Sequence, residues 1–364
     1  MLYALIHQPR VAAAICILIL CGFAVAGLWP FRQIPNEVTW LGNQPGVHFG
    51  KHGIILSAGA LPAVGSGACS IEMWVRPGAG EDSGALLAFY GLGGDTGVSL
   101  QRSLTDLRLD RETVGGRPIK SYVSEFLPDG KLVFMTVVSG TWGTAVYQDG
   151  ALVRNLSRPR ALAGDCSGSL GVGDSSQGHN SWQGDIQGVA IYQRELTPAQ
   201  VQVNYQSWRT AGRPDERNSG KPDVLYLFNE KSGSVVRDHG ASGVNLTIPE
   251  LYLNVYRTWL QSPVSAYELH WGYIQDILIN VGGFVPFGFA LSVFLASTGR
   301  VRNVGAWAVF GGVIVSLTIE VLQAYLPTRN SDLTDVLTNT LGTCLGAVLY
   351  AIWQRRLVQA GGDV

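Results

Sequence analysis

Six polar residues near the carboxyl end of the chain form three pairs with helical spacing. The pairs are three or four residues apart: Asp276 with Asn280, Glu320 with Gln323, and Asp335 with Asn339. At this spacing both members of a pair lie on one face of a helix. Carboxylates and amides on facing helices can hold a polar head group, move a proton or join the helices by hydrogen bonds. The spacing therefore predicts one polar site built from three helices.

Arg329 and Asp332 lie between the second and third pairs. The planar guanidinium of arginine matches a carboxylate or a phosphate. Arg329 could pair with an acidic neighbour and lock the helices together, or it could stay free and hold the anionic head of a lipid or lipid-linked sugar. Both interpretations stay open. Together these residues are the predicted polar cluster: Asp276, Asn280, Glu320, Gln323, Arg329, Asp332, Asp335 and Asn339.

The polar cluster does not identify a catalytic residue. These helical segments show no histidine, no nucleophile beside a base and no spacing typical of metal ligands. An enzymatic role would depend on Glu320 or Asp335 as acid or base, with Arg329 holding a phosphate. We therefore leave the catalytic residues unassigned and predict no metal site.

The elements that position these residues are long apolar runs. Four runs of roughly 18 to 23 residues have the length that crosses a membrane: 11–29, 277–296, 304–326 and 336–353. The first also resembles a cleaved signal peptide, because Arg10 precedes it and Ala24 and Ala26 fit a cleavage site. We favour a retained anchor, since the run is longer than the apolar part of a usual signal peptide.

Basic residues predict the orientation of these spans. Arg300 and Arg302 lie between the second and third spans, and Arg355 and Arg356 follow the last. The positive-inside rule places both regions in the cytoplasm and the polar middle of the chain outside. We expect a bacterial inner-membrane protein whose polar domain lies in the periplasm or outside. The net charge of -1 gives no support for nucleic-acid binding.

The polar middle of the chain predicts an all-β sandwich. From about residue 47 to 249, short alternating runs are separated by glycine, aspartate, serine and proline. Asp149 and Gly150 form a strong hairpin signal between two of these runs. Cys69 and Cys166 are the two cysteines of this region. They can form a disulfide in an oxidising compartment, or they are two separate buried thiols.

Several segments of this region resemble a LamG-like, concanavalin A-like jelly roll: I-E-M-W-V-R-P, Y-Q-D-G-A, S-L-G-V-G and G-D-I-Q-G-V-A-I-Y. The resemblance implies a domain that binds a glycan or a protein partner, in some cases with calcium at the rim. One loop offers oxygen donors and an aromatic ring: Asp174, His179, Asn180 and Trp182. The alternative is an ordinary turn with a core tryptophan.

The carboxyl-terminal third resembles the VanZ-like membrane family. The resemblance lies in D-I-L-I-N-V-G-G-F-V-P-F-G-F, I-E-V-L-Q-A-Y-L-P-T-R and S-D-L-T-D-V-L-T-N-T-L-G-T-C-L-G. It implies a core of four spans, so the β domain would be an insertion after the first. It also implies an association of the founding member with resistance to a glycopeptide antibiotic, without an established reaction. We predict a first helix in 1–30, a sandwich in 40–250, an interfacial connector in 251–273 and three helices in 274–355.

Two functions follow from these features. The first is an envelope membrane protein that binds a glycan or protein through the sandwich, and handles or senses an envelope lipid through the helices. The alternative is a membrane enzyme that acts on a lipid-linked phosphate or sugar.

Overall fold

The structure is a computed structural model of the 364-residue chain. It describes residues 8–29, 34–63, 67–80, 83–91, 96–111, 119–174, 181–253, 259–260, 271–327, 329 and 331–361. The chain divides into two compact units, one formed by Met1–Arg32 with Arg257–Val364 and the other by Gln33–Tyr256. Most of the predicted connector lies outside the described residues.

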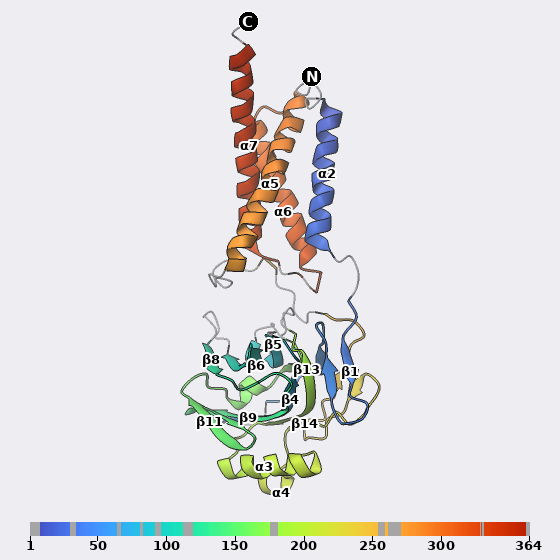
Figure 1. Ribbon diagram of the computed structural model, residues 1–364, viewed down its shortest axis with the longest axis vertical. Coiled ribbons are helices and arrows are strands. Elements are labelled where there is room, and N and C mark those ends of the chain that lie inside the picture. The colour runs from blue at the N-terminus through green and yellow to red at the C-terminus, as the bar shows by residue number, and fades with distance from the viewer. Residues whose placement is uncertain are drawn as a thin grey trace. The chain divides into compact units, whose positions relative to one another are not determined.

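The first unit contains four helices that are long and apolar enough to cross a membrane (Figure 1). They are α2 (Pro9–Leu28), α5 (Trp271–Ser297), α6 (Val304–Gln323) and α7 (Leu333–Gly361). Helices α5 and α7 begin before the apolar runs that predicted them. The reason is that hydropathy marks the stretch suited to hydrocarbon, whereas helical hydrogen bonding continues into polar residues at the ends.

Glycines let α5 and α7 approach closely. A Cβ atom added to Gly342 would lie 2.3 Å from the carbonyl oxygen of Val281, and one added to Gly346 would lie 2.2 Å from that of Val285. A Cβ on Gly288 would meet the carbonyl oxygen of Thr343 at 2.2 Å. Small residues are the usual means by which membrane helices pack at short range. These contacts fix how the polar faces of the two helices meet.

The second unit is a sandwich of two antiparallel sheets (Figure 1). In the first sheet the strand order is β1-β2-β13-β4-β9-β10-β11, and β14 also pairs with β13. These strands are β1 (Val38–Trp40), β2 (Val47–Phe49), β4 (Cys69–Pro77), β9 (Val133–Gly140), β10 (Gly143–Gln148), β11 (Ala151–Leu156), β13 (Gly184–Tyr192) and β14 (Val224–Tyr226).

The second sheet has the order β15-β16-β3-β12-β5-β6-β7-β8. Its strands are β3 (Ile55–Ser57), β5 (Gly84–Tyr90), β6 (Thr96–Ser103), β7 (Asp106–Arg111), β8 (Ile119–Val123), β12 (Ser169–Val172), β15 (Val235–Val236) and β16 (Leu246–Thr247). In each sheet four neighbouring pairs are consecutive strands and three join strands that are distant in sequence. The chain therefore crosses repeatedly from one sheet to the other. The architecture is the predicted all-β sandwich joined to helices that can span a membrane.

Alternation along the strands builds the core between the two sheets. In β4, Ile71, Met73 and Val75 are buried in the main core. The intervening Glu72 and Trp74 lie on the other face of the sheet, as expected from the two-residue period of a strand. That outer face is covered by α3 (Pro198–Ala211), with the short helix α4 (Glu216–Ser219) after it (Figure 1).

Local signals at the predicted turns have their expected geometry. Asp149 and Gly150 have φ values of 51° and 80° between β10 and β11, which confirms the hairpin. At the start of α3, Thr197 and Gln200 form a capping box. The helix ends at Gly212, whose φ of 67° is the left-handed conformation typical of such a cap.

The two ends of the sandwich unit are paired with each other. The backbone N–H of Asn36 donates to the carbonyl of Glu250 at 3.0 Å, and that of Tyr252 donates to Ile34 at 2.9 Å. The side chain of Asn36 also donates to the carbonyl of Pro249 at 2.8 Å. The segments by which the chain enters and leaves the sandwich therefore lie side by side.

Candidate functional site

The predicted polar cluster lies at one end of the helix unit. Helices α2 and α6 end there, and α5 and α7 begin there, because successive helices run in opposite directions (Figure 1). The three predicted pairs therefore all lie near this end of the helices. The hydrogen bonds below join these pairs across the helix interfaces.

Amide side chains join α7 to its two neighbours. The Nδ2 of Asn280 on α5 donates to the Oδ1 of Asp335 on α7 at 2.9 Å. The Nδ2 of Asn339 donates to the Oγ of Ser316 on α6 at 2.9 Å. Both hydrogen bonds connect residues on different helices, so they resist separation of the helices. Ser316 was missed by the sequence analysis, although it lies four residues before Glu320 and thus on the same helical face.

Glu320 is the most buried carboxylate of the polar cluster, with 2% of its surface exposed. Its Oε2 accepts a hydrogen bond from the backbone N–H of Asp332 at 2.8 Å. The carboxylate of Asp332 in turn accepts one from the backbone N–H of Thr334 at 2.7 Å. The two carboxylates thus satisfy backbone donors at the start of α7, where a helix lacks its own acceptors.

Gln323 and Arg329 contact the last turn of α2. The Nε2 of Gln323 donates to the carbonyl of Gly27 at 3.0 Å. The Nη2 of Arg329 donates to the carbonyls of Ala26 and Trp29 at 3.1 and 3.2 Å. The final carbonyls of a helix lack internal partners and carry partial negative charge, so an arginine there is favourable.

Arg329 does not make the pairing that the sequence analysis considered. Within the described ranges it forms no ion pair with Glu320, Asp332, Asp335 or any other carboxylate. Its hydrogen bonds to the described residues use only Nη2, so Nε and Nη1 have no acceptor in that part of the chain. The carbonyls at the end of α2 take the place of the expected acidic partner.

The polar cluster holds more negative than positive charge. Asp332 and Asp335 are within electrostatic range of Glu320, and Asp276 is within range of Asp335. None of these acidic residues forms an ion pair with a described lysine, arginine or histidine. Asp276 is exposed and the other three are buried or half-buried.

Three buried polar atoms of this site have no hydrogen-bond partner among the described residues. They are the Oε1 of Gln323, the Oδ1 of Asn339 and the Oγ1 of Thr334. A buried polar atom without a partner is costly, and in native proteins it marks a place for a water, an ion or a ligand. The site therefore combines a fixed guanidinium, an excess of carboxylates and unused acceptors.

The residues that were candidates for ligand binding in the sandwich loop belong to the other unit. Asp174 is fully buried, and its carboxylate accepts hydrogen bonds from the hydroxyls of Ser181, at 2.7 Å, and Tyr252. Trp182 is 1% exposed and belongs to the main core. Burial removes both from a surface ligand, which corrects the sequence-based expectation for these two residues. His179 and Asn180 lie outside the described residues.

Calcium at the rim of the sandwich stays a prediction. The described residues contain no group of three or more acidic, histidine or cysteine side chains that could hold a metal ion. The Asp174 carboxylate, which was the acidic member of the candidate loop, is held by two hydroxyls of the fold.

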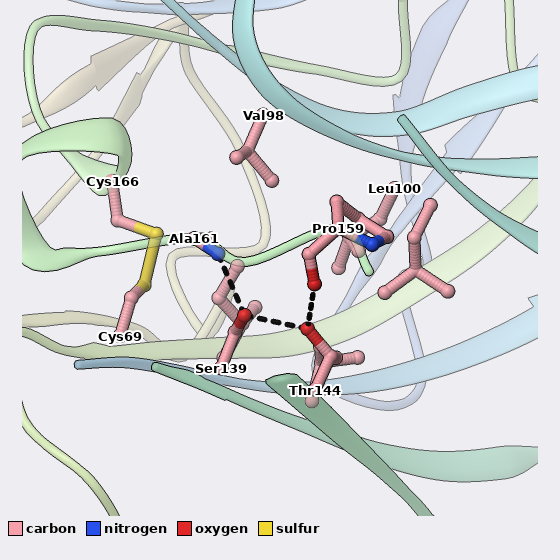
Figure 2. A pocket seen from close by; sticks show the side chains of 11 residues that line it. Cys69, Val98, Leu100, Ser139, Thr144, Pro159, Ala161 and Cys166 are labelled. Carbon is pink, nitrogen blue, oxygen red and sulfur yellow. Dashed lines mark hydrogen bonds between the residues drawn. A yellow bond between two sulfur atoms is a disulfide. The ribbon is translucent and has the colours of Figure 1, made fainter. Parts of the chain in front are cut away.

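Cys69 and Cys166 form a disulfide at one end of the sandwich core. Figure 2 shows it beside a small, mainly apolar pocket whose polar groups bond one another. Ser139 and Thr144 hydroxyls are 2.6 Å apart, Thr144 donates to the Pro159 carbonyl at 2.7 Å, and the Ala161 N–H donates to Ser139 at 2.7 Å. This pocket is closed by the packing of the fold and offers no unused polar group for a ligand.

Glu72 is a buried carboxylate that the sequence analysis missed. It accepts hydrogen bonds from Asn204 at 2.8 Å, Trp208 at 3.0 Å and Tyr192 at 3.3 Å. Burial raises its pKa from 4.5 to about 7, and the hydrogen bonds only partly offset that rise. Two of the donors come from α3, so Glu72 fixes this helix on the sheet. The sequence signal that could have identified Glu72 is an acidic residue inside the otherwise apolar strand motif I-E-M-W-V.

Comparison with known proteins identifies both parts of the chain. Residues 224–354 match the sequence model of the VanZ/LLP1 family, and residues 50–202 match that of the concanavalin A-like lectin/glucanases superfamily. The VanZ/LLP1 match begins at β14, within the sandwich unit. Protein VanZ of Enterococcus faecium is 35% identical over 89 residues, which are 24% of this chain and 52% of that protein. The chain thus spans about half the length of this curated relative.

Solved structures similar to this chain include a candidate carbohydrate-binding protein from Bacteroides ovatus, with 13% identity and a TM-score of 0.42 over 60% of this chain and 59% of that one. A heptameric SAP-like pentraxin from Limulus polyphemus has 15% identity and a TM-score of 0.36 over 60% of this chain and 95% of that one. On the two sequence matches, the chain combines a VanZ-like domain with a concanavalin A-like domain.

Proposed function

We propose that this chain is a cell-envelope membrane protein whose helices bind the anionic phosphate in the head group of an envelope lipid or lipid-linked sugar. The observation that carries the proposal is Arg329, which has no carboxylate partner among the described residues although acidic side chains lie close by in the chain. A charged group at the end of apolar helices needs a counter-ion or a polar ligand. A phosphate supplies both charge and acceptor oxygens.

The geometry of Arg329 supports this role. Its Nη2 is held by two carbonyls of α2, which restricts the orientation of the planar guanidinium. The remaining donors, Nε and Nη1, lie on the same rigid plane and suit a phosphate with two acceptor oxygens. An arginine already anchored by the fold loses less side-chain freedom when it binds a ligand.

The proposal puts this end of the helices at the outer surface of the membrane. Arg300, Arg302, Arg355 and Arg356 belong to the opposite end, after α5 and along the last part of α7. The positive-inside rule assigns that opposite end to the cytoplasm. Head groups of the outer leaflet would then have direct access to Arg329.

For the sandwich we propose recognition of a glycan or a protein partner. The support is the match to a superfamily described by lectins and glucanases. A screen of envelope glycans against the full chain in nanodiscs tests this part. We expect saturable binding that competes with free glycan, and an absence of binding to every envelope glycan would direct the search toward a protein partner.

The lipid part is tested by native mass spectrometry of the full chain in mild detergent. The variants are Arg329→Gln, which keeps an amide donor for the α2 carbonyls but loses the charge, and Arg329→Lys, which keeps the charge. We expect a co-purified phosphate-bearing lipid with the wild type and with Arg329→Lys, and its loss from Arg329→Gln. Equal occupancy in Arg329→Gln, with unchanged thermal stability, would contradict the proposal.

A further inference from the structure

We infer that the head group bound at this site carries a primary ammonium beside its phosphate. The inference rests on the proposed function and extends it from one charge to two. Arg329 receives the phosphate, and the neighbouring acidic and amide oxygens receive the ammonium. The ligand class is therefore an amine-bearing phospholipid head group of the phosphoethanolamine type.

The first support is a group of neighbouring carboxyl side chains that have no described basic partner. Glu320, Asp332 and Asp335 are mutually within electrostatic range, and Asp276 is close to Asp335. In the part of the chain that the structure describes, no basic side chain lies within ion-pair distance of any of them. Carboxylates gathered beside apolar helices repel one another unless a cation or protons neutralise them. A ligand ammonium provides such a cation.

The second support is independent of charge and concerns hydrogen-bond donors. Gln323 is 9% exposed, and its Oε1 has no donor among the described residues. The amide orientation is fixed, because the backbone carbonyl of Gly27 accepts and therefore requires Nε2 on its side. The oxygen is therefore a buried acceptor that has no described donor. The Thr334 hydroxyl, buried next to Asp335, also has no described partner.

The two halves of the proposed ligand fit neighbouring positions. Arg329 and Gln323 both contact the last turn of α2, at Ala26 and Gly27. Gln323 lies three residues after Glu320, on the same face of α6. Gln323 therefore connects the turn of α2 that Arg329 contacts with the face of α6 that carries Glu320. A phosphate joined to an ammonium by a short carbon chain suits these neighbouring positions.

A metal ion fits these acceptors less well than an ammonium. The described residues contain no group of three or more acidic, histidine or cysteine side chains close enough to coordinate one ion. Divalent cations need several oxygen ligands converging on one point. A primary ammonium has three donors that point in different directions, so it can bond acceptors that do not converge.

Phosphatidylethanolamine and its N-acetyl derivative are the probes that test the inference. Acetylation removes the ammonium charge and leaves the phosphate, the glycerol and the acyl chains unchanged. Each lipid is supplied separately to the delipidated full chain in detergent, and occupancy is measured by native mass spectrometry. The variants are Glu320→Gln and Asp335→Asn, which keep shape and hydrogen-bond acceptors. Glu195→Gln, an exposed carboxylate of the sandwich unit, is the control for loss of one charge.

We expect the wild type and Glu195→Gln to bind phosphatidylethanolamine about tenfold more tightly than its N-acetyl derivative, and this preference to fall to about twofold or less in Glu320→Gln or Asp335→Asn. Equal binding of both lipids by the wild type would overturn the inference and leave the phosphate site at Arg329 intact. Binding of neither lipid by the wild type would overturn the proposed function as well. A preference that persists unchanged in both carboxylate variants would also overturn the inference.

Discussion

At the scale of single residues, acidic side chains occupy two different environments. Glu72 lies inside the sandwich unit with three hydrogen-bond donors, all from side chains of the fold. Glu320 lies at the end of the helix unit and accepts a backbone hydrogen bond beside acceptors that have no described donor. In the first environment both oxygens of the carboxylate accept hydrogen bonds from the fold, whereas in the second three buried polar atoms have no described partner. This difference is why our proposal places the functional site in the helices.

Glu72 makes the stability of the sandwich unit depend on pH. In the unfolded chain its carboxyl loses the proton near 4.5, whereas in the folded unit it does so near 7. Between these values the folded state binds more protons, so its stability falls as pH rises. As pH rises from 4.5 to 8, we expect the ionisation of Glu72 to lower the free energy of unfolding by on the order of 3 kcal/mol.

Glu72→Gln tests this dependence, because glutamine keeps the shape of the side chain and does not titrate. Urea unfolding of the full chain, followed by tryptophan fluorescence at pH 4.5, 6 and 8, measures the effect. The wild type should lose stability across this series and Glu72→Gln should lose less. The control is Glu195→Gln, on the exposed surface of the same unit. Parallel pH profiles for wild type and Glu72→Gln would show that Glu72 does not titrate in this range.

Residue types and spacing predicted the members of the polar cluster but not all of their partners. The helical spacing of Asp335 and Asn339 was visible in the sequence, whereas their contacts with Asn280 and Ser316 depend on how α5, α6 and α7 are rotated. The contact of Arg329 with α2 was not predictable either. It joins residues about three hundred positions apart through backbone carbonyls, which carry no sequence signal.

At the scale of elements, close packing of α5 and α7 holds the polar faces in register. Gly346→Ala should separate the two helices, because the added Cβ would lie 2.2 Å from the Val285 carbonyl oxygen. Gly282→Ala is the matched control, since its added Cβ meets no atom within 4 Å. We expect a loss of about 1 to 3 kcal/mol for Gly346→Ala and no loss for the control. Thermal unfolding in detergent measures both, and equal stability of the two variants would contradict the packing.

The disulfide between Cys69 and Cys166 should stabilise the sandwich. It closes a loop with a sequence separation of 97 residues, so its removal increases the freedom of the unfolded chain. We expect a double Cys69→Ser, Cys166→Ser variant to lose about 2 to 5 kcal/mol of unfolding free energy. Urea unfolding gives the value, and Cys344→Ser, an exposed thiol of the helix unit, is the control. An unchanged midpoint in the double variant would show that the bond contributes nothing.

The elements themselves were largely predictable. Apolar runs of membrane length found the four helices, and the Asp149-Gly150 pair found its hairpin. The ends of α5 and α7 were less well predicted, because Asp276 and Asp335 belong to helices but not to the apolar runs. The environment of the loop around Asp174 and Trp182 was also not predictable from residue types. Residues typical of an exposed turn are buried there, because Tyr252 from a distant segment bonds the carboxylate of Asp174 and Trp182 packs into the main core.

At the scale of the whole molecule, the sandwich begins and ends at neighbouring points of its own unit. The backbone pairing between Ile34 and Tyr252 means that the segments entering and leaving it are adjacent. A domain whose ends are adjacent can be inserted into another without stretching the host. The helix unit is indeed formed by two separate stretches, Met1–Arg32 and Arg257–Val364, with the sandwich between them in the sequence.

Removal of the sandwich should therefore leave the helix unit able to bind lipid. We expect a variant in which residues 36–250 are replaced by a short glycine-serine linker to retain the phosphate-bearing lipid of the wild type and to lose glycan binding. Native mass spectrometry and the glycan screen measure the two properties on the same preparation. If the folded helix variant loses the lipid, the sandwich contributes to that site.

The central claim is that Arg329 holds the phosphate of a lipid head group, and lipid occupancy of the full chain with glutamine at this position tests it most directly. The account predicts that native mass spectra show a phosphate-bearing lipid on the wild type and none on Arg329→Gln, while both proteins remain folded. The same lipid at the same occupancy on both proteins would contradict it, and would leave Arg329 as a cap for the end of α2.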